Sequence, residues 1–161
     1  MTIANSTLYL LIRLGTDRYA IDAESVVEVL PIVRLKSIPS APVGVVGMMS
    51  YRGSAMPVMD LNIIAFGTPT PERIMTRIVV VRYRQHDIGT ETALFGLLIP
   101  EVLQTAHFDA TGFVRVGLAN ARAPYLGPVL TTAEGMLQQL LIAPLLNEEL
   151  RVTVNTRGVA A

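Results

Sequence analysis

Few side chains in this sequence could carry acid–base or nucleophilic chemistry, and those that could stand apart. The chain has 2 histidines and no cysteine. His86 lies in the polar stretch RYRQHDIGTET, and His107 lies among apolar residues. A catalytic histidine needs an oriented partner, so we interpret both as surface or structural residues. Ser54 follows Gly53 but lacks the second glycine of a nucleophile elbow. The sequence therefore indicates no enzyme and no catalytic residue.

The densest group of carboxylates is formed by Asp17, Asp22, Glu24 and Glu28. A metal site would need several of them to converge on one point. On a strand followed by a short helix they point in different directions, so we expect solvated side chains rather than metal ligands. Phosphate-binding patterns such as G-x-G-x-x-G and G-x-x-x-x-G-K-[ST] are also absent from the sequence. We expect neither a metal nor a cofactor.

The segment MSYRGSAMPVMDL, Met49 to Leu61, places an arginine between two apolar arms. Gly53 supplies the positive backbone dihedral that a tight hairpin turn requires. An arginine at such a turn is by default a solvated charge. Arg52 also has apolar neighbours and Tyr51 beside it, a setting typical of interface hot spots. Without catalytic partners, its functional interpretation is docking to another protein.

Four of the 7 methionines, Met48, Met49, Met56 and Met59, lie on the two arms of this hairpin. Methionine is flexible and polarisable, and it is common on surfaces that adapt to partners. Filling gaps in a small core is the simpler role for each one. Alternation along a strand would place some on each side, so both roles can occur together.

The elements that would position these residues are short strands joined by turns. Residues 7–15 and 19–23 predict one hairpin, and the arms of Arg52-Gly53 predict another. Pro57 cannot donate to a ladder, which predicts an edge or a bulge there. Helix is expected only in short pieces, near 23–27, 61–66 and 144–150. This pattern favours an all-β barrel or sandwich.

The proline-containing segment FGTPTPERIMT, residues 66–76, is the best boundary between two halves. The halves also resemble one another weakly. YAIDAESVV aligns with FGLLIPEVL, and the Arg52 hairpin aligns with APYLGPVLTTAEGMLQQLLIA. A duplicated barrel is therefore an open interpretation.

Composition excludes several classes of protein. The 161 residues suit one domain or two small, closely packed units. Lys+Arg 13 balance Asp+Glu 13, which argues against nucleic-acid binding because phosphate recognition needs a concentrated positive face. Hydrophobic residues make up 51%, yet no apolar run reaches the roughly 20 residues of a membrane helix. The N-terminus does not read as a signal peptide, so we expect a cytoplasmic protein without membrane insertion.

Three segments together resemble the CheW family of chemotaxis coupling proteins. They are RYAIDAESVVEVLP, IPSAPVGVVGMMSYRGSAMPVMDL and TRIVVVRY. The resemblance implies an all-β fold of two intimately packed, five-stranded Src-homology-3-like barrels with short helices. It implies one domain over 7–150, with a first barrel at roughly 17–75, a second at roughly 76–142 and a shared N-terminal strand. The tail, 151–161, has no clear counterpart.

The resemblance also implies a function. Family members are non-catalytic adaptors that couple the cytoplasmic helical tip of a chemoreceptor to the regulatory domain of a CheA-type histidine kinase, and so are recruited to membrane-bound arrays. Arg52 matches the family arginine associated with receptor docking, with Tyr51 and Gly53 beside it. The family usually has Asn-Leu-Arg-Gly where this chain has Ser-Tyr-Arg-Gly. The cleft between the barrels would take the receptor helix.

Kinase contact is implied for five positions on the first barrel: Val26, Glu28, Gly47, Met48 and Met56. An alternative within signalling is a coupler of a Wsp-type surface-sensing pathway that controls a diguanylate cyclase. Another is a fragment of a larger kinase or fused coupler; Met1 and the short chain favour a standalone coupler. From a different class, a small β-barrel enzyme or ligand-binding protein would need a convergent polar pocket, which the sequence does not indicate.

Overall fold

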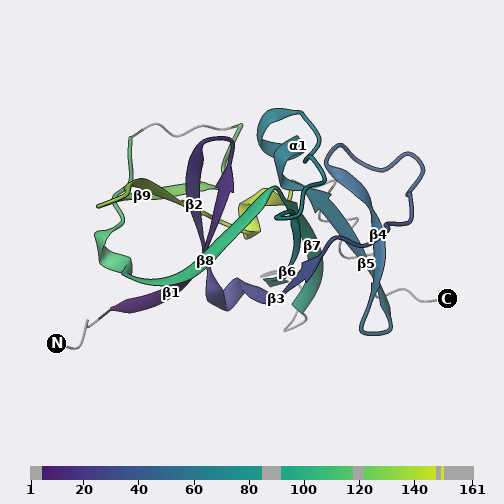
Figure 1. The fold of residues 1–161 in the computed structure, drawn as a ribbon, viewed down its shortest axis with the longest axis horizontal. Helices are drawn as coiled ribbons and strands as arrows, with labels where there is room; N and C mark the ends of the chain where they lie inside the picture. Colours follow the sequence, from purple (N-terminus) through teal and green to yellow (C-terminus); the bar gives the residue numbers. More distant parts are fainter. Residues whose placement is uncertain (1–4, 85–91, 118–121, 148–149, 151–161) are drawn as a thin grey trace.

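The protein is mostly β-strand in the computed structural model, which describes residues 5–84, 92–117, 122–147 and 150 (Figure 1). The described strands are β1 (Ser6–Leu14), β2 (Asp17–Asp22), β3 (Val26–Pro31), β4 (Val45–Tyr51), β5 (Ser54–Asp60), β6 (Arg77–Arg84), β7 (Thr92–Ile99), β8 (Glu101–Asp109), β9 (Leu126–Thr132) and β10 (Gly135–Leu140). The described helices are α1 (Leu61–Phe66) and three 3-10 turns, η1 (Ala23–Ser25), η2 (Ala110–Gly112) and η3 (Ala143–Leu145). The predicted all-β class with short helices is confirmed. His86 and the tail 151–161 lie outside the described residues.

The strands form two five-stranded sheets that lie side by side in Figure 1. Sheet A has the order β8-β1-β2-β10-β9, and sheet B has the order β3-β6-β7-β5-β4. Each sheet closes into a barrel, because the segment that follows the strand at one edge (β8 or β3) pairs with the strand at the other edge (β9 or β4). In sheet B, Lys36 and Met48 exchange backbone hydrogen bonds of 2.8 and 2.9 Å, and Val114 and Val129 do the same in sheet A. The predicted pair of five-stranded barrels is confirmed.

The sheets do not follow the predicted division of the chain at residue 76. β6 and β7 belong to sheet B with β3, β4 and β5, whereas β2 belongs to sheet A. The barrel ranges 17–75 and 76–142 are therefore wrong. Two strands cross between the sheets: β3 leaves β2 to pair with β6, and β8 leaves β7 to pair with β1. Because these pairings are distant in sequence, the local breakers at 66–76 could not reveal them.

The two halves of the chain nevertheless have the same topology. In sheet order, β8-β1-β2-β10-β9 of sheet A corresponds strand by strand to β3-β6-β7-β5-β4 of sheet B. Each strand of the first half therefore corresponds to the strand five places later in the chain. The parallel pair β2–β10 likewise corresponds to the parallel pair β7–β5. The internal duplication indicated by the sequence is thus present in the fold, but each half contributes its first two strands to one sheet and its last three strands to the other.

One hydrophobic core joins the two sheets. Its largest cluster includes Ile12 and Leu14 of β1 together with Val81 of β6, and Phe95 and Leu97 of β7. Four of these five side chains have no exposed surface, and Leu14 is 2% exposed. Each fully buried side chain of this size contributes roughly 1.5–3 kcal/mol of transfer free energy. The sheets therefore form a single packed unit.

Both predicted hairpins are confirmed, and the local chemistry of each explains its end points. β4 pairs with β5 from Val45↔Met59 to Tyr51↔Ser54. Pro57 lies opposite Met48, whose backbone N–H and C=O both bond to Lys36 on the far side. The nitrogen of Pro57 thus faces away from β4, and the parallel pairing of β5 with β7 begins only at Val58. The missing donor removes no ladder bond.

Helix α1 follows β5 directly and has a defined cap at each end. The Asp60 side chain accepts hydrogen bonds from the N–H groups of Asn62 and Ile63, and Gly67 ends the helix with φ 76°. Asp and Gly are preferred at these two positions for those reasons. The predicted helix over 61–66 is confirmed. Of the one near 144–150, the structure describes the turn η3 and a helical Leu150, with 148–149 outside the described residues. No helix in the described parts is long and apolar enough to span a membrane.

Candidate functional site

The arginine between the apolar arms lies in a two-residue turn. Tyr51 pairs with Ser54, so Arg52 and Gly53 alone form the connection. Both have positive φ, 48° for Arg52 and 79° for Gly53. This is the combination that a type I′ hairpin requires. The turn holds the arginine at the tip of the hairpin.

A three-residue arrangement, here called the Arg52 cluster, links this tip to β3. The Tyr51 hydroxyl donates a hydrogen bond of 2.5 Å to Oε2 of Glu28. A guanidinium nitrogen of Arg52 lies 3.6 Å from the same oxygen, and the guanidinium carbon lies 5.0 Å from the centre of the Tyr51 ring. The Arg52 side chain is 67% exposed. The cluster therefore holds an exposed cation against a buried ring and a carboxylate.

The electrostatics of the cluster favour a neutral tyrosine. Burial raises the pKa of Tyr51 above its ordinary value of 10.0, and the hydrogen bond to Glu28 raises it further. The Arg52 charge opposes this shift of the pKa without cancelling it. The hydroxyl consequently remains a donor to Glu28 at neutral pH, which fixes the orientation of the carboxylate.

The structure brings together residues that the sequence analysis assigned to two partners. Tyr51 and Arg52 were assigned to the receptor and Glu28 to the kinase, yet all three are in mutual contact. Any partner that contacts the exposed guanidinium also lies beside the Glu28 carboxylate. The sequence carried no signal for this contact because β3 and the β4–β5 hairpin are separated by a long loop.

The other predicted kinase positions fall into exposed and buried groups. Val26 and Met48 are half-buried and keep surface that a partner can reach. Met56 is 0% exposed and packs in a cluster with Tyr51 and Val80, so a direct contact through Met56 is wrong. It supports Tyr51 from inside the sheet.

Gly47 is also a structural position. A Cβ atom there would lie 2.7 Å from the backbone oxygen of Lys36 and 2.9 Å from the Cβ of Leu35. The chain passes this closely because Lys36 bridges to the next residue, Met48, and closes the barrel. Only glycine allows that approach. Gly47 therefore shapes sheet B and presents no side chain to a partner.

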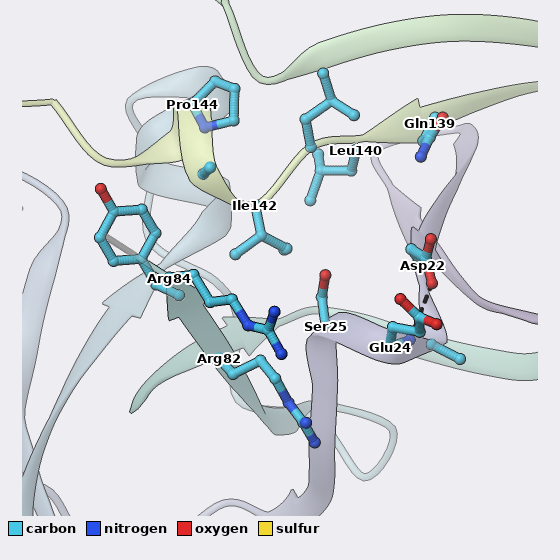
Figure 2. Close-up of a pocket in the computed structure, with 13 residues that line it drawn as sticks. Asp22, Glu24, Ser25, Arg82, Arg84, Gln139, Leu140, Ile142 and Pro144 are labelled. Atoms are coloured by element: carbon cyan, nitrogen blue, oxygen red, sulfur yellow. Dashed lines mark hydrogen bonds between the residues drawn. The ribbon is translucent and has the colours of Figure 1, made fainter. Parts of the chain in front are cut away.

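A cleft of about 750 Å³ lies between the two sheets (Figure 2). Asp22, Glu24 and Ser25 line it at the β2–η1 junction, and Arg82 and Arg84 line it at the end of β6. Apolar residues after β10, including Ile142, cover a third side. None of the eight predicted binding residues lines this cleft. The alternating RYR of β6 was a possible signal, because it places two arginines on one face of a strand.

No catalytic or metal-binding arrangement occurs among the residues that the structure describes. His107 lies on β8 with Nδ1 3.2 Å from the Ser6 hydroxyl, in an exposed position. No three described His, Asp or Glu side chains converge on a point that could hold a metal ion. Asp22, one of the four carboxylates considered above, caps η1 by accepting from the N–H of Glu24. In its described parts, the site is built from contacts suited to binding.

Comparison with known proteins found a matching family and a similar solved structure. The sequence model of the CheW-like domain family matches residues 8–150. The fold is similar to the crystal structure of the scaffolding protein TtCheW from Thermoanaerobacter tengcongensis, with a TM-score of 0.72 and 22% identity over 88% of each chain. A search of curated proteins found none that matches this chain in sequence.

Proposed function

Because this chain belongs to the CheW-like domain family, we propose that it is a non-catalytic adaptor that couples chemoreceptors to a CheA-type histidine kinase. The observation that carries the proposal is the family match over 8–150, which includes nearly the whole chain. In this function the protein works in the cytoplasm and is recruited to membrane-bound receptor arrays. Its partners are the helical tip of a chemoreceptor and the regulatory domain of the kinase.

The receptor contact is proposed at the Arg52 cluster. The Arg52 guanidinium is exposed, yet the Tyr51 ring and Glu28 hold its position. An exposed cation that is already oriented loses less conformational freedom on binding than a free arginine side chain. Gly53 contributes by allowing the tight turn rather than by contact. The cluster thus offers a fixed charge for a polar group on the receptor helix.

The kinase contact is proposed on the barrel formed by sheet B. Val29 and Val33 are 39% and 38% exposed, and Val26 and Met48 are half-buried. Exposed apolar side chains are often contact points for a protein partner. Gly47 and Met56 act beneath this surface by maintaining the barrel. Glu28 contacts Arg52 and lies on β3 of this barrel, so it belongs to both proposed contacts.

The proposal is tested by binding assays with purified partners. The chain is mixed with the cytoplasmic fragment of a chemoreceptor and, separately, with the kinase regulatory domain from the same organism. We expect both to bind, and Arg52→Glu to weaken receptor binding by about tenfold, equivalent to about 1.4 kcal/mol. Folding is retained because the exposed Arg52–Glu28 pair contributes at most about 1 kcal/mol.

The matched control is Arg115→Glu, which makes the same charge change at an exposed position in the segment after η2. It should bind the receptor fragment as the wild type does. Equal affinities for Arg52→Glu and the wild type would overturn the assignment of Arg52. A wild-type chain that binds neither partner would overturn the adaptor function itself.

A further inference from the structure

The loop between α1 and β6 carries the most exposed large hydrophobic side chain among the described residues. Ile74 has 91% of its surface exposed, and Met75 beside it has 42%. A single exposed apolar side chain is ordinary on a protein surface. Ile74 differs because hydrogen bonds hold the backbone of its loop on both sides of it.

On the N-terminal side, the loop is fixed to the end of β5 through Thr70. The Thr70 hydroxyl donates a hydrogen bond of 2.6 Å to Oδ1 of Asp60, and its N–H donates one of 2.8 Å to Oδ2. Thr70 is 6% exposed and Asp60 is 1% exposed. Water therefore competes little for these bonds, and the charged acceptor makes them stronger than neutral ones.

On the C-terminal side, Thr76 and Arg77 close the loop into a turn around Ile74. The Thr76 hydroxyl donates to the Pro71 carbonyl at 2.8 Å and accepts from the N–H of Arg73 at 3.0 Å. The N–H of Thr76 donates to the Arg73 carbonyl at 3.0 Å. The Arg77 guanidinium donates to the carbonyl of Ile74 itself at 2.6 Å and to that of Thr76 at 2.9 Å. The backbone of the exposed isoleucine is thus held in one conformation.

A fixed loop with an apolar tip is suited to insertion into a partner. Binding orders a mobile loop at a cost in conformational entropy, and a loop that is already ordered avoids this cost. The transfer free energy of the buried isoleucine then strengthens the complex. Residues that dominate binding energy commonly fill pockets in this way, whereas the contacts around them contribute little. Ile74 has the properties of such an anchor.

The loop adjoins the proposed kinase contact on sheet B. Pro31, the last residue of β3, pairs with Arg77, the first residue of β6. Val33 lies two residues after Pro31 and Met75 lies two residues before Arg77, so both segments leave the ladder at the same end. Val33 is 38% exposed. The apolar surface proposed for the kinase therefore continues onto the loop that carries Ile74.

Positive charge accompanies this apolar surface. The two segments that meet there, 31–36 and 70–77, contain four cationic side chains and one carboxylate: Arg34, Lys36, Arg73, Arg77 and Glu72. Three of the four cations are exposed, and Arg77 is half-buried. A complementary partner surface is apolar at its centre and acidic at its rim.

We propose that Ile74 is the anchor of the kinase contact and enters an apolar pocket with an acidic rim on the kinase regulatory domain. The inference rests on the adaptor function proposed above and adds to it an anchoring residue and the chemistry of its pocket. The five positions that the family resemblance assigned to the kinase do not include this loop. Only the exposure of Ile74 and the hydrogen bonds around it identify the loop.

Ile74→Asn tests the anchor in the full chain, with the purified kinase regulatory domain as the probe. The two side chains are similar in size, and so exposed a position tolerates the change without loss of folding. We expect binding to the regulatory domain to weaken about tenfold and binding to the receptor's cytoplasmic fragment to stay unchanged. The matched control is Met136→Gln, because Met136 is 73% exposed on β10 of the other sheet. This control should bind the regulatory domain as the wild type does.

A second variant tests whether the fixed loop presents the anchor. Thr76→Val keeps the shape of the side chain but removes the hydroxyl that bridges Pro71 and Arg73. We expect kinase binding to weaken about threefold, because the loop must then be ordered on binding. The same change should cause no further loss in the Ile74→Asn background, since both variants act through one side chain. An equal loss in the two backgrounds would overturn the presentation of Ile74 by this loop.

The outcomes separate this inference from the adaptor function. If the wild type binds the regulatory domain and Ile74→Asn binds it equally well, the anchor is refuted while the adaptor function stands. If Ile74→Asn instead weakens receptor binding, or dissociates a dimer of this chain, the loop serves another partner and the kinase pocket is refuted. If the wild type does not bind the regulatory domain, both fall.

Discussion

Asp60 holds together the end of β5, the start of α1 and the loop that follows, so Asp60→Asn should destabilise the protein. The side chain is 1% exposed and accepts four hydrogen bonds. Oδ1 accepts from the N–H groups of Asn62 and Ile63 at 2.9 and 3.2 Å and from the Thr70 hydroxyl at 2.6 Å. Oδ2 accepts from the N–H of Thr70 at 2.8 Å.

The size of the effect follows from these four bonds. An asparagine can keep its carbonyl oxygen at the Oδ1 position and retain the helix cap. Its amide group then faces the N–H of Thr70, a residue that is 6% exposed, and two donors confront each other. Loss of a hydrogen bond to a charged group costs about 1.5–3 kcal/mol, and the buried donor left unpaired adds to it. We expect a loss of about 2–4 kcal/mol in the free energy of unfolding.

Urea unfolding followed by circular dichroism measures this loss. The matched control is Asp109→Asn, because Asp109 makes the same local contacts to the N–H and hydroxyl of Thr111 through one oxygen, at an exposed site. Asparagine can keep both of those contacts, so the control should unfold as the wild type does. If the two variants lose the same stability, the burial and second oxygen of Asp60 are not what matters. The loop that Asp60 secures also carries the exposed residue Ile74, which is 91% exposed on the proposed kinase-binding barrel.

Three further results follow from the geometry. Gly47→Ala should lose about 1–3 kcal/mol of unfolding free energy in urea titrations, since its Cβ would overlap a crossing backbone, whereas Gly117→Ala, with open space around it, should change little. Tyr51 has a raised pKa, so its contribution to stability is complete below pH 10.0 and is lost as the pH rises through the folded-state pKa; Tyr51→Phe should flatten the decline in stability above pH 10.0, and an equal slope would contradict the shift. Fragments 1–70 and 71–161 should each give the circular dichroism of unfolded chains and regain β-structure on mixing, because each sheet needs strands from both; a folded fragment alone would refute the interlocked topology.

The sequence was sufficient wherever the deciding interactions are local. The Arg52-Gly53 turn, the first hairpin and the helix over 61–66 depend on neighbours within a few residues, and all three are confirmed. The motif from Ser50 to Leu61 also carried the family resemblance, since it combines a tight turn, a proline at a non-bonded position and a capping aspartate. These features need a specific residue at a specific place, which is why they are visible in one sequence.

The sequence was insufficient where strands choose distant partners. The segment 66–76, with its two prolines, was predicted as the boundary between two halves. In the structure β3 pairs with β6 and β8 pairs with β1, so both sheets contain strands from both halves. The same crossing brings Glu28 to the β4–β5 hairpin and joins two sets of residues that seemed separate. Alternation alone also could not show that Met56 faces the core and that Met48 keeps exposed surface.

What this sequence determined by itself is an all-β chain with defined hairpins and a family identity. Only the tertiary structure decided which strands close which barrel, and therefore which charges meet. Arg13 and Arg82 occupy equivalent strand positions, and nothing in their local sequence distinguishes them. β8 places Glu101 opposite Arg13, whereas the ladder of β3 with β6 ends at Val26↔Val81, one residue before Arg82, because backbone pairing between distant segments sets the neighbours of each side chain.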